Sequence, residues 1–293
     1  MCEKNFLIAH SHLLNLLIDN FKMNLSHALL FNGIKGIGKY TTAVHLINLV
    51  QKKTKIHNQN SFHINSEDSP AMIENIRDLI KQVNLTNSNK NQKSFIILDN
   101  ANSLNSNSFN ALLKTIEEPP NNTVIILISH DLKKIPKTII SRCIKLDFKP
   151  LNQNQIMEYC LKNQISFNES DIKKLWGIIG GSIEKLLLLS EFGGLNVKNE
   201  LDILIQKNTL DFNKFEKFYD SISNEYNKYF KLIIDCLYIE KKKALIKYFY
   251  DKRFSRRVLS FFKNVEMLSE KELNNDKKKE LYFILSEYLE IKK

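Results

Sequence analysis

A glycine-rich segment in the first part of the chain has the residue types and spacing of a phosphate-binding loop. Gly33, Gly38 and Lys39 fit the pattern G-x-x-x-x-G-K, with a further glycine at Gly36. Glycines in such a loop leave backbone N–H groups free to wrap a phosphate, and the lysine reaches the β- and γ-phosphates of a nucleotide. The start of the following helix adds a favourable dipole. The segment therefore predicts a nucleotide site.

The residue that follows the lysine departs from this pattern. A phosphate-binding loop of this kind needs a serine or threonine there to hold Mg²⁺, and this chain has Tyr40. Thr41 is no simple replacement, because one residue along a helix is a rotation of about 100°. The sequence thus keeps the phosphate cradle but lacks the usual hydroxyl ligand of the metal. We expect ATP binding to be weak or absent and no cofactor to be required.

An acidic residue of the same kind of site follows a second apolar run. Phe95–Leu98 is typical of a buried strand, and Asp99 at its end is placed to hold Mg²⁺ through its water shell. In P-loop enzymes that hydrolyse nucleotide, a glutamate usually comes next and orients the attacking water, whereas this chain has Asn100. An amide does not accept a proton as a general base does. Asp99 and the glycine-rich loop therefore predict a degenerate nucleotide site.

Strands and helices that alternate along residues 1–149 are expected to position these groups. Short apolar runs predict buried strands at Ala28–Asn32, Ser94–Leu98, Thr123–Ser129 and Ile144–Phe148. Helical periodicity and start signals predict helices at residues 6–22, 39–50, 69–82 and 105–118, and the polar residues 51–61 are predicted to be a loop. This alternation indicates an α/β fold with a parallel sheet.

The pattern changes at Lys149–Pro150, after which only helical periodicity remains. About three short helices are expected within residues 152–190, with a turn at Gly180–Gly181, and four or five more within residues 197–293. A boundary is expected at Gly193–Gly194. The sequence therefore predicts three domains: an α/β domain over residues 1–149, a small helical domain over 150–194 and a helical domain over 195–293.

The composition limits the class of protein. The 293 residues carry a formal net charge of +11, which favours a nucleic-acid or acidic partner, although lysine is also the commonest solvated filler. The four cysteines form no CxxC pair and the seven histidines have no metal-ligand spacing, so we expect no zinc or other metal. No apolar run approaches the roughly 20 residues that cross a bilayer. We expect a cytoplasmic protein with no membrane partner.

A longer motif resembles a known family. The stretch Asn110–Pro120 (NALLKTIEEPP) is followed by Ser141-Arg142-Cys143, downstream of the glycine-rich loop. Together they resemble the clamp-loader branch of the AAA+ family, and the spacing matches through about residue 190. The C-terminal third matches only in length and helical class. The resemblance implies an AAA+ P-loop core, a helical lid at 150–194 and a helical collar at 195–293 that joins subunits.

The resemblance also implies a function. Clamp-loader subunits form a five-subunit ring that opens a sliding clamp and loads it onto primed DNA, with ATP between subunits. In this family the arginine of the SRC motif reaches the γ-phosphate held by the next subunit, and Arg142 matches that position. Such an arginine finger is worth about 10³–10⁵ in rate. The expected partners are therefore other loader subunits, primed DNA and, indirectly, the sliding clamp.

Two more positions bear on whether the chain hydrolyses ATP. Glu184 stands in the lid where active members of the family carry an arginine, and its charge would repel phosphate. Ser129 fits the family's polar sensor position. Many bacterial members also carry a zinc module with four cysteines, and residues 51–66 here contain no cysteine. The resemblance therefore implies a non-hydrolysing subunit of a DNA polymerase III clamp loader.

Two alternatives stay open at this level. One is an active ATPase motor subunit, in which Thr41 and another acid replace the missing groups. The other is a DNA-binding module that uses the basic C-terminal helices. Glu117 and Glu118 come at the end of a predicted helix, where the dipole disfavours negative charge. They fit contact with a basic residue of a partner and a solvated pair equally well.

Overall fold

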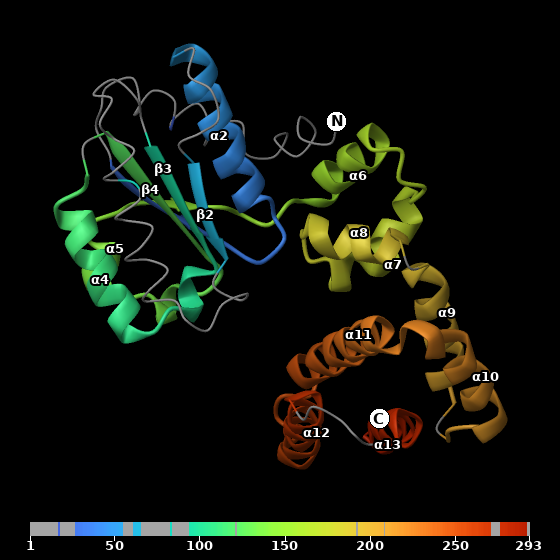
Figure 1. Cartoon of the computed structure of the whole chain (residues 1–293). Helices are drawn as coiled ribbons and strands as arrows, with labels where there is room; N and C mark the ends of the chain where they lie inside the picture. The colour runs from blue at the N-terminus through green and yellow to red at the C-terminus, as the bar shows by residue number, and fades with distance from the viewer. Residues whose placement is uncertain are drawn as a thin grey trace. The chain divides into compact units, whose positions relative to one another are not determined.

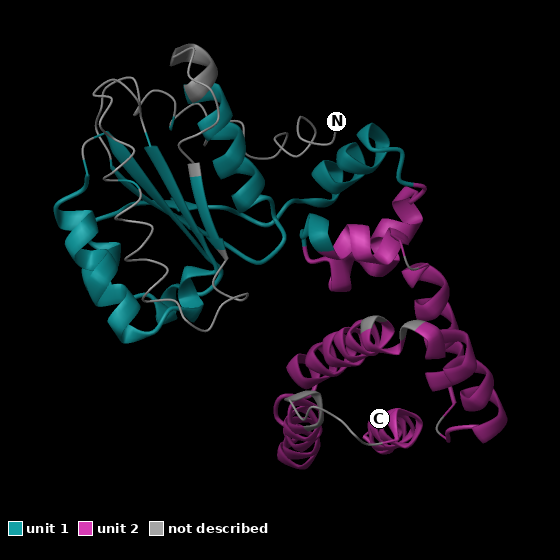
Figure 2. Cartoon of the chain, viewed as in Figure 1, with its two compact units in different colours: residues 1–165, 181–184 teal, residues 166–180, 185–293 magenta. Residues whose placement is uncertain are grey.

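The computed structural model describes residues 17, 27–54, 61–65, 83, 94–120, 122–191, 193–207, 209–270 and 276–291 (Figure 1). The chain divides into two compact units, residues 1–165 with 181–184 and residues 166–180 with 185–293 (Figure 2). The helix predicted at 69–82 lies outside the described residues. So does the helix predicted at 6–22, except for Leu17, which is helical and buried. The division into three domains stays a prediction.

Within the described part of the first unit, five parallel strands form one sheet. They are β1 (Ala28–Asn32), β2 (Ser61–Asn65), β3 (Ser94–Asp99), β4 (Thr123–Ser129) and β5 (Ile144–Asp147). Their order across the sheet is β2-β3-β4-β1-β5. The predicted α/β fold with a parallel sheet is confirmed, and four of the strands lie where short apolar runs predicted them.

The strand β2 and the end of the helix before it correct the prediction of a loop at residues 51–61. The helix α2 extends over Lys39–Thr54, and β2 begins at Ser61. The last turn of α2, with the sequence QKKT, has no apolar residue to mark it as helical. β2 lies at the edge of the sheet, where the half-buried Phe62 and Ile64 flank the exposed His63. It therefore lacks the continuous apolar run of the buried strands.

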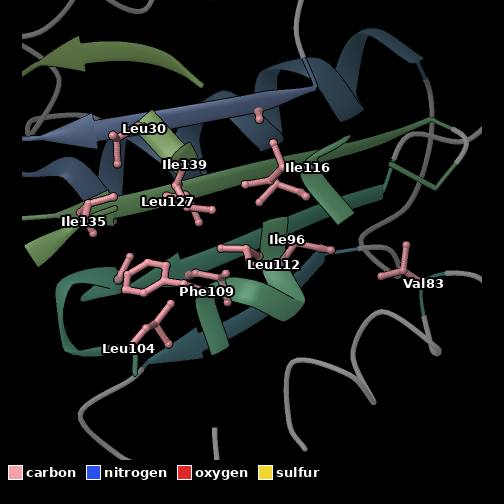
Figure 3. Close-up of a cluster of buried hydrophobic side chains, with 14 residues drawn as sticks. Leu30, Val83, Ile96, Leu104, Phe109, Leu112, Ile116, Leu127, Ile135 and Ile139 are labelled. Carbon is pink, nitrogen blue, oxygen red and sulfur yellow. The ribbon is translucent and has the colours of Figure 1, made fainter. Parts of the chain in front are cut away.

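Helices cover both faces of the sheet, with α2 on one face and α4 (Ser106–Glu117) on the other (Figure 1). On the α4 face, strand residues Leu30, Ile96 and Leu127 form a buried cluster with helix residues Phe109, Leu112 and Ile116 (Figure 3). The helix residues recur at helical spacing, so one stripe of α4 faces the sheet. The helix predicted at 105–118 is confirmed to within one residue at each end.

Among the residues of this unit that the structure describes, three short helical segments connect the larger elements. η2 (Ala101–Ser103) follows β3, η3 (Leu132–Lys134) follows β4, and α5 (Lys137–Ile140) comes before β5. Because the strands are parallel, the segments that follow β1, β3 and β4 lie at the carboxyl edge of the sheet. α5 and the end of α4 lie at the amino edge. Open parallel sheets bind ligands at their carboxyl edge.

The rest of the chain is helical. The helices are α6 (Gln153–Lys162), α7 (Glu169–Ile179), α8 (Ile183–Glu191), α9 (Gly194–Ile205), α10 (Phe212–Ile222), α11 (Tyr226–Lys247), α12 (Lys252–Glu270) and α13 (Lys277–Glu290), with the short segment η4 (Ser223–Glu225). α6, α7 and α8 confirm the three short helices predicted within residues 152–190. The five helices α9–α13 of the described residues confirm the four or five predicted for the C-terminal third.

Candidate functional site

The glycine-rich loop joins β1 to α2 at the carboxyl edge of the sheet, and its lysine is turned into the loop itself. The Lys39 Nζ donates hydrogen bonds to the carbonyls of Gly33 and Ile34, at 2.7 Å each. Lys39 is only 6% exposed. Burial lowers the pKa of its ammonium to about 8, while the charges of Asp99 and Glu184 act in the opposite direction. The loop therefore solvates its own lysine with backbone carbonyls.

A second contact on the loop comes from residues 182–184, at the start of α8. The Gly36 carbonyl accepts the backbone N–H groups of Ile183 and Glu184, at 2.9 and 3.1 Å. The approach is so close that a Cβ added at Gly36 would lie 2.4 Å from both the Ser182 Oγ and the Glu184 Cβ. Glu184 thus lies against the loop. A carboxylate at this place repels the negative charge of a phosphate.

Tyr40 directs its side chain towards the edge strand β2. Its hydroxyl lies 3.1 Å from the Nδ1 of His63, and the two rings meet edge-on with their centroids 5.8 Å apart. Partial desolvation of the imidazole beside Tyr40 lowers the pKa of His63 although much of the side chain is exposed, so the neutral imidazole prevails at pH 7 and is suited to accept a hydrogen bond from the phenol. The Tyr40–His63 pair joins α2 to β2 and supplies no serine or threonine hydroxyl to the loop.

Asp99 and Asn100 end β3 at the same edge of the sheet. The Asp99 Oδ1 accepts the backbone N–H of Asn100, at 2.8 Å. Asn100 has left-handed backbone angles (φ 53°, ψ 40°), and its carbonyl accepts the N–H and Oγ of Ser103 at 2.9 and 2.8 Å. Asparagine enters this conformation more readily than most residues. The residue that stands in place of a catalytic base therefore turns the chain into η2.

Asn102, which sequence reasoning did not single out, holds the end of β4. Its Oδ1 accepts the Ser129 hydroxyl at 3.3 Å and the backbone N–H of His130 at 3.1 Å. The Ser129 Oγ in turn accepts the N–H of Asp131 at 3.1 Å, and Ser129 is 1% exposed. The hydroxyl at the sensor position is thus engaged within the chain. No spacing in the sequence marks this contact, because Asn102 and Ser129 belong to different elements.

Arg142 lies at the opposite edge of the sheet from the glycine-rich loop. It comes two residues before β5, whose first residue, Ile144, pairs with Leu29 of β1, whereas the loop begins after Asn32. The three residue-to-residue steps from Leu29 to Asn32 span about 10 Å, at ~3.3 Å per residue. Arg142 therefore does not belong to the phosphate site of its own chain.

The guanidinium of Arg142 is exposed and yet held by neighbours. Its Nη1 donates to the Thr138 carbonyl at 3.1 Å and to the Ser141 Oγ at 3.4 Å. Its Nη2 forms an ion pair with the Glu117 Oε1 at 2.8 Å, and the two side chains are 42% and 43% exposed. The basic residue that Glu117 meets thus lies in its own chain.

The structure sorts the predicted site residues into two groups. Gly33, Gly36, Gly38, Lys39 and Asp99 gather at the carboxyl edge, and Arg142 lies apart from them. Among the described residues, no three or more His, Cys, Asp or Glu side chains cluster as metal ligands would. In the same part of the chain, no helix has the length and apolar character to span a membrane.

Comparison with known proteins gives a consistent group of relatives. Residues 9–152 match the family described as DNA polymerase III, delta subunit. A DNA polymerase III subunit gamma of Buchnera aphidicola subsp. Acyrthosiphon pisum is 28% identical over 68% of this chain and 62% of its own length. The subunit delta' of Bacillus subtilis is 30% identical over 50% of this chain and 49% of its own. The chain thus spans less than two thirds of each of these two relatives.

The fold also has a solved counterpart. A DNA polymerase III gamma subunit-related protein from Thermotoga maritima aligns with 94% of this chain and 98% of its own, with a TM-score of 0.55 and 17% identity. At that identity the likeness shows the fold alone. The fold is that of an AAA+ P-loop core followed by a mostly helical C-terminal region.

Proposed function

This chain is related to the AAA+ subunits of the DNA polymerase III clamp loader, and from that premise we propose that it is a non-hydrolysing, delta-prime-like subunit of such a complex. In this role it gives Arg142 to ATP held by a neighbouring subunit and helps to load the sliding clamp onto primed DNA. One observation carries the proposal. Arg142 is exposed at the amino edge of the sheet, while the chain's own phosphate loop at the carboxyl edge has Glu184 against it and Tyr40 in place of a metal-binding hydroxyl.

The surroundings of the loop support the absence of hydrolysis. A phosphate in the loop would meet the carboxylate of Glu184, and the two carbonyls bonded to the Lys39 Nζ leave that ammonium one N–H donor for it. Tyr40 and Asn100 supply neither the hydroxyl ligand of Mg²⁺ nor a general base. The residues present do not fit a hydrolysable Mg·ATP. The proposal therefore assigns no ATP chemistry to this chain's own loop.

Arg142 has the chemistry that the proposed role needs. A guanidinium stays protonated at any physiological pH, and its planar fork of donors matches phosphate oxygens. Negative charge spreads over the oxygens of a γ-phosphoryl group during its transfer, so a cation that reaches these oxygens stabilises the transition state. Because Arg142 lies away from its own loop, the phosphate that it contacts belongs to another subunit in this proposal.

The proposal is tested by Arg142→Ala in a complex reconstituted with gamma/tau-like and delta-like subunits. Loss of a finger lowers the rate at the one site it serves by about 10³–10⁵. We therefore expect clamp loading to fall sharply, and the ATPase rate of the complex to fall by the share of that site. Lys137→Ala, which removes an exposed charge from nearby α5, is the matched control. Normal clamp loading by Arg142→Ala would show that the finger assignment is wrong.

The relatives named gamma and tau favour a second candidate, a hydrolysing motor subunit. It would need Thr41 and a further acid to replace the missing groups. ATP turnover by the purified chain, abolished by Lys39→Ala, would support it. The non-hydrolysing role predicts no turnover by either protein.

The turn between α11 and α12 favours a third candidate, a DNA-binding module. Phe249 and Tyr250 are 70% and 96% exposed there, with their ring centroids 5.9 Å apart. Exposed cations flank them on both helices: Lys242, Lys243, Lys247, Lys252, Arg253 and Arg256. Aromatic faces stack on unpaired bases and cations bind phosphates, so this turn has both parts of a single-strand binding surface.

Full-length protein with Phe249→Ala and Tyr250→Ala tests this candidate by fluorescence anisotropy on primed DNA. Stacking contributes about 1–3 kcal/mol per base, so the double variant is expected to bind at least about fivefold more weakly. Phe283→Ala removes a comparably exposed aromatic, 56% exposed on α13, as the control. Binding that responds equally to both changes, or no salt-dependent binding at all, would rule the turn out as a DNA-binding surface.

A further inference from the structure

The ion pair between Glu117 and Arg142 forms where separate segments of the first unit reach the same edge of the sheet. α4 runs from the carboxyl edge, after β3, to the amino edge, before β4, and Glu117 is its last residue. The His27 Nε2, just before β1, lies 2.9 Å from the Ile116 carbonyl and ties the end of α4 to this edge. Arg142 comes to the same edge after α5. The topology of the fold thus brings the two charges together.

Glu117 occupies a place in α4 where a carboxylate is unfavourable by itself. The carbonyls of the last helical turn carry partial negative charge, so a cation must compensate a carboxylate there. Arg142 is that cation. The next residue, Glu118, is the C-cap and forms no ion pair with any described residue. Because exposed ion pairs add little to stability, we expect this pair to matter more for the direction of the guanidinium than for folding.

The contacts of Arg142 leave part of its guanidinium available. The group has five N–H donors. Within the described part of the chain, three contacts, with the Thr138 carbonyl, the Ser141 Oγ and the Glu117 carboxylate, engage three of them and leave two. Arg142 is therefore able to meet a phosphate while Thr138 and Glu117 still hold it.

We infer that Glu117 is a positioning residue for the arginine finger: it holds the Arg142 guanidinium in one direction at the amino edge, ready for a phosphate of the neighbouring subunit. The inference rests on the proposed function. An arginine side chain loses conformational entropy when its several rotatable bonds are held in one conformation. Contacts with Glu117 and Thr138 hold the Arg142 side chain before the phosphate arrives, so less entropy is lost on binding. The carboxylate also keeps the planar group oriented, which a catalytic contact requires.

The test compares Glu117→Gln with Glu118→Gln in the reconstituted loader. The two variants make the same chemical change at adjacent residues, and only the first removes the charge that pairs with Arg142. We expect Glu117→Gln to lower the kcat of ATP hydrolysis at the served site about twofold to fivefold, the size of effect that exposed ion pairs have. The KM for ATP should not change, because this residue does not bind the nucleotide. Glu118→Gln should behave as the unchanged protein.

A double variant separates positioning from a general structural effect. If Glu117 acts through Arg142, then Glu117→Gln combined with Arg142→Ala is no slower than Arg142→Ala alone. Thermal unfolding of each variant checks that all remain folded. Wild-type kcat in Glu117→Gln, a raised kcat, or additive losses in the double variant would each overturn the positioning role. Reduced activity of Arg142→Ala beside an unaffected Glu117→Gln overturns only this inference, whereas an unaffected Arg142→Ala overturns the proposed function as well.

Discussion

Lys39 is a buried, charged side chain whose hydrogen-bond partners are backbone carbonyls. Two carbonyls hold its Nζ at 2.7 Å, and burial lowers its pKa from 10.5 to about 8. Between pH 8 and pH 10.5 the unfolded chain therefore binds a proton that the folded chain has released. Stability rises with pH wherever the unfolded state binds more protons. The contribution of Lys39 to the free energy of unfolding is thus expected to rise over this range.

Urea unfolding of the protein and of Lys39→Met at pH 7.5 and pH 10.5 measures this contribution. A shift of one pKa unit corresponds to about 1.4 kcal/mol, so the gain from this group is of the order of 3 kcal/mol. Lys39→Met keeps the length of the side chain without a titrating group. We expect it to lack the gain that the unchanged protein shows. An identical pH dependence of the two proteins would show that the Lys39 ammonium is not held in the buried position.

At the residue scale, local motifs could be predicted from the sequence more readily than contacts between residues far apart in the chain. The spacing of Gly33, Gly38 and Lys39 is local, so the loop and its lysine could be predicted. The contacts of Glu117 with Arg142 and of Glu184 with Gly36 join residues far apart in the chain. No periodicity encodes such pairs, although the family resemblance places Glu184 near the phosphate. They depend on which strands lie side by side.

At the scale of elements, the close approach of α8 to the phosphate loop makes Gly36 a sensitive position. Its φ is +78°, and a Cβ there would lie 2.4 Å from atoms of Ser182 and Glu184. Gly180 also has a positive φ, of +53°, but the nearest atom to an added Cβ is 4.0 Å away. An alanine at either position would therefore have a strained backbone, but only at Gly36 would its Cβ also clash with neighbouring atoms.

Thermal and urea unfolding of Gly36→Ala and Gly180→Ala is expected to separate these two costs. A left-handed alanine costs about 1–2 kcal/mol, which both variants incur. Overpacking adds about 1–3 kcal/mol in Gly36→Ala alone, unless residues 182–184 move away from the loop. Equal losses in the two variants would mean that residues 182–184 do not pack on the loop in solution.

Most of the strands that sequence patterns predicted are buried along their length. β1, β3 and β4 are continuous apolar runs because helices cover both sides of the sheet, and α4 shows helical spacing because one stripe faces the core. The edge strand β5 was predicted although only Leu146 of its four residues is buried, whereas in the edge strand β2 the exposed His63 interrupts the apolar run between Phe62 and Ile64. The tail of α2 escaped because it is polar and its helical state depends on the turns before it.

At the scale of the whole molecule, the altered phosphate loop predicts how the purified chain responds to nucleotide. A ligand that binds only the folded state raises the melting temperature, because it stabilises that state by RT ln(1 + L/Kd), where L is the concentration of free ligand. Because Glu184 places a carboxylate against the loop and Tyr40 supplies no serine or threonine hydroxyl for Mg²⁺, we expect millimolar Mg·ATP to leave the melting temperature unchanged. Differential scanning fluorimetry with and without Mg·ATP measures this. A rise of several degrees would show that the chain binds nucleotide, and Lys39→Ala would then show whether the loop is responsible.

The opposite positions of Arg142 and the phosphate loop have a consequence for assembly. A subunit with a finger at one edge of its sheet and an open nucleotide site at the other can repeat head to tail, since each copy completes the site of the next. In the proposed role, this chain offers the finger but no working site to receive one. It therefore terminates such a row rather than extending it. Copies of the chain by themselves are expected to form no nucleotide-dependent filament or ring, and a row of loader subunits that includes it has a defined end.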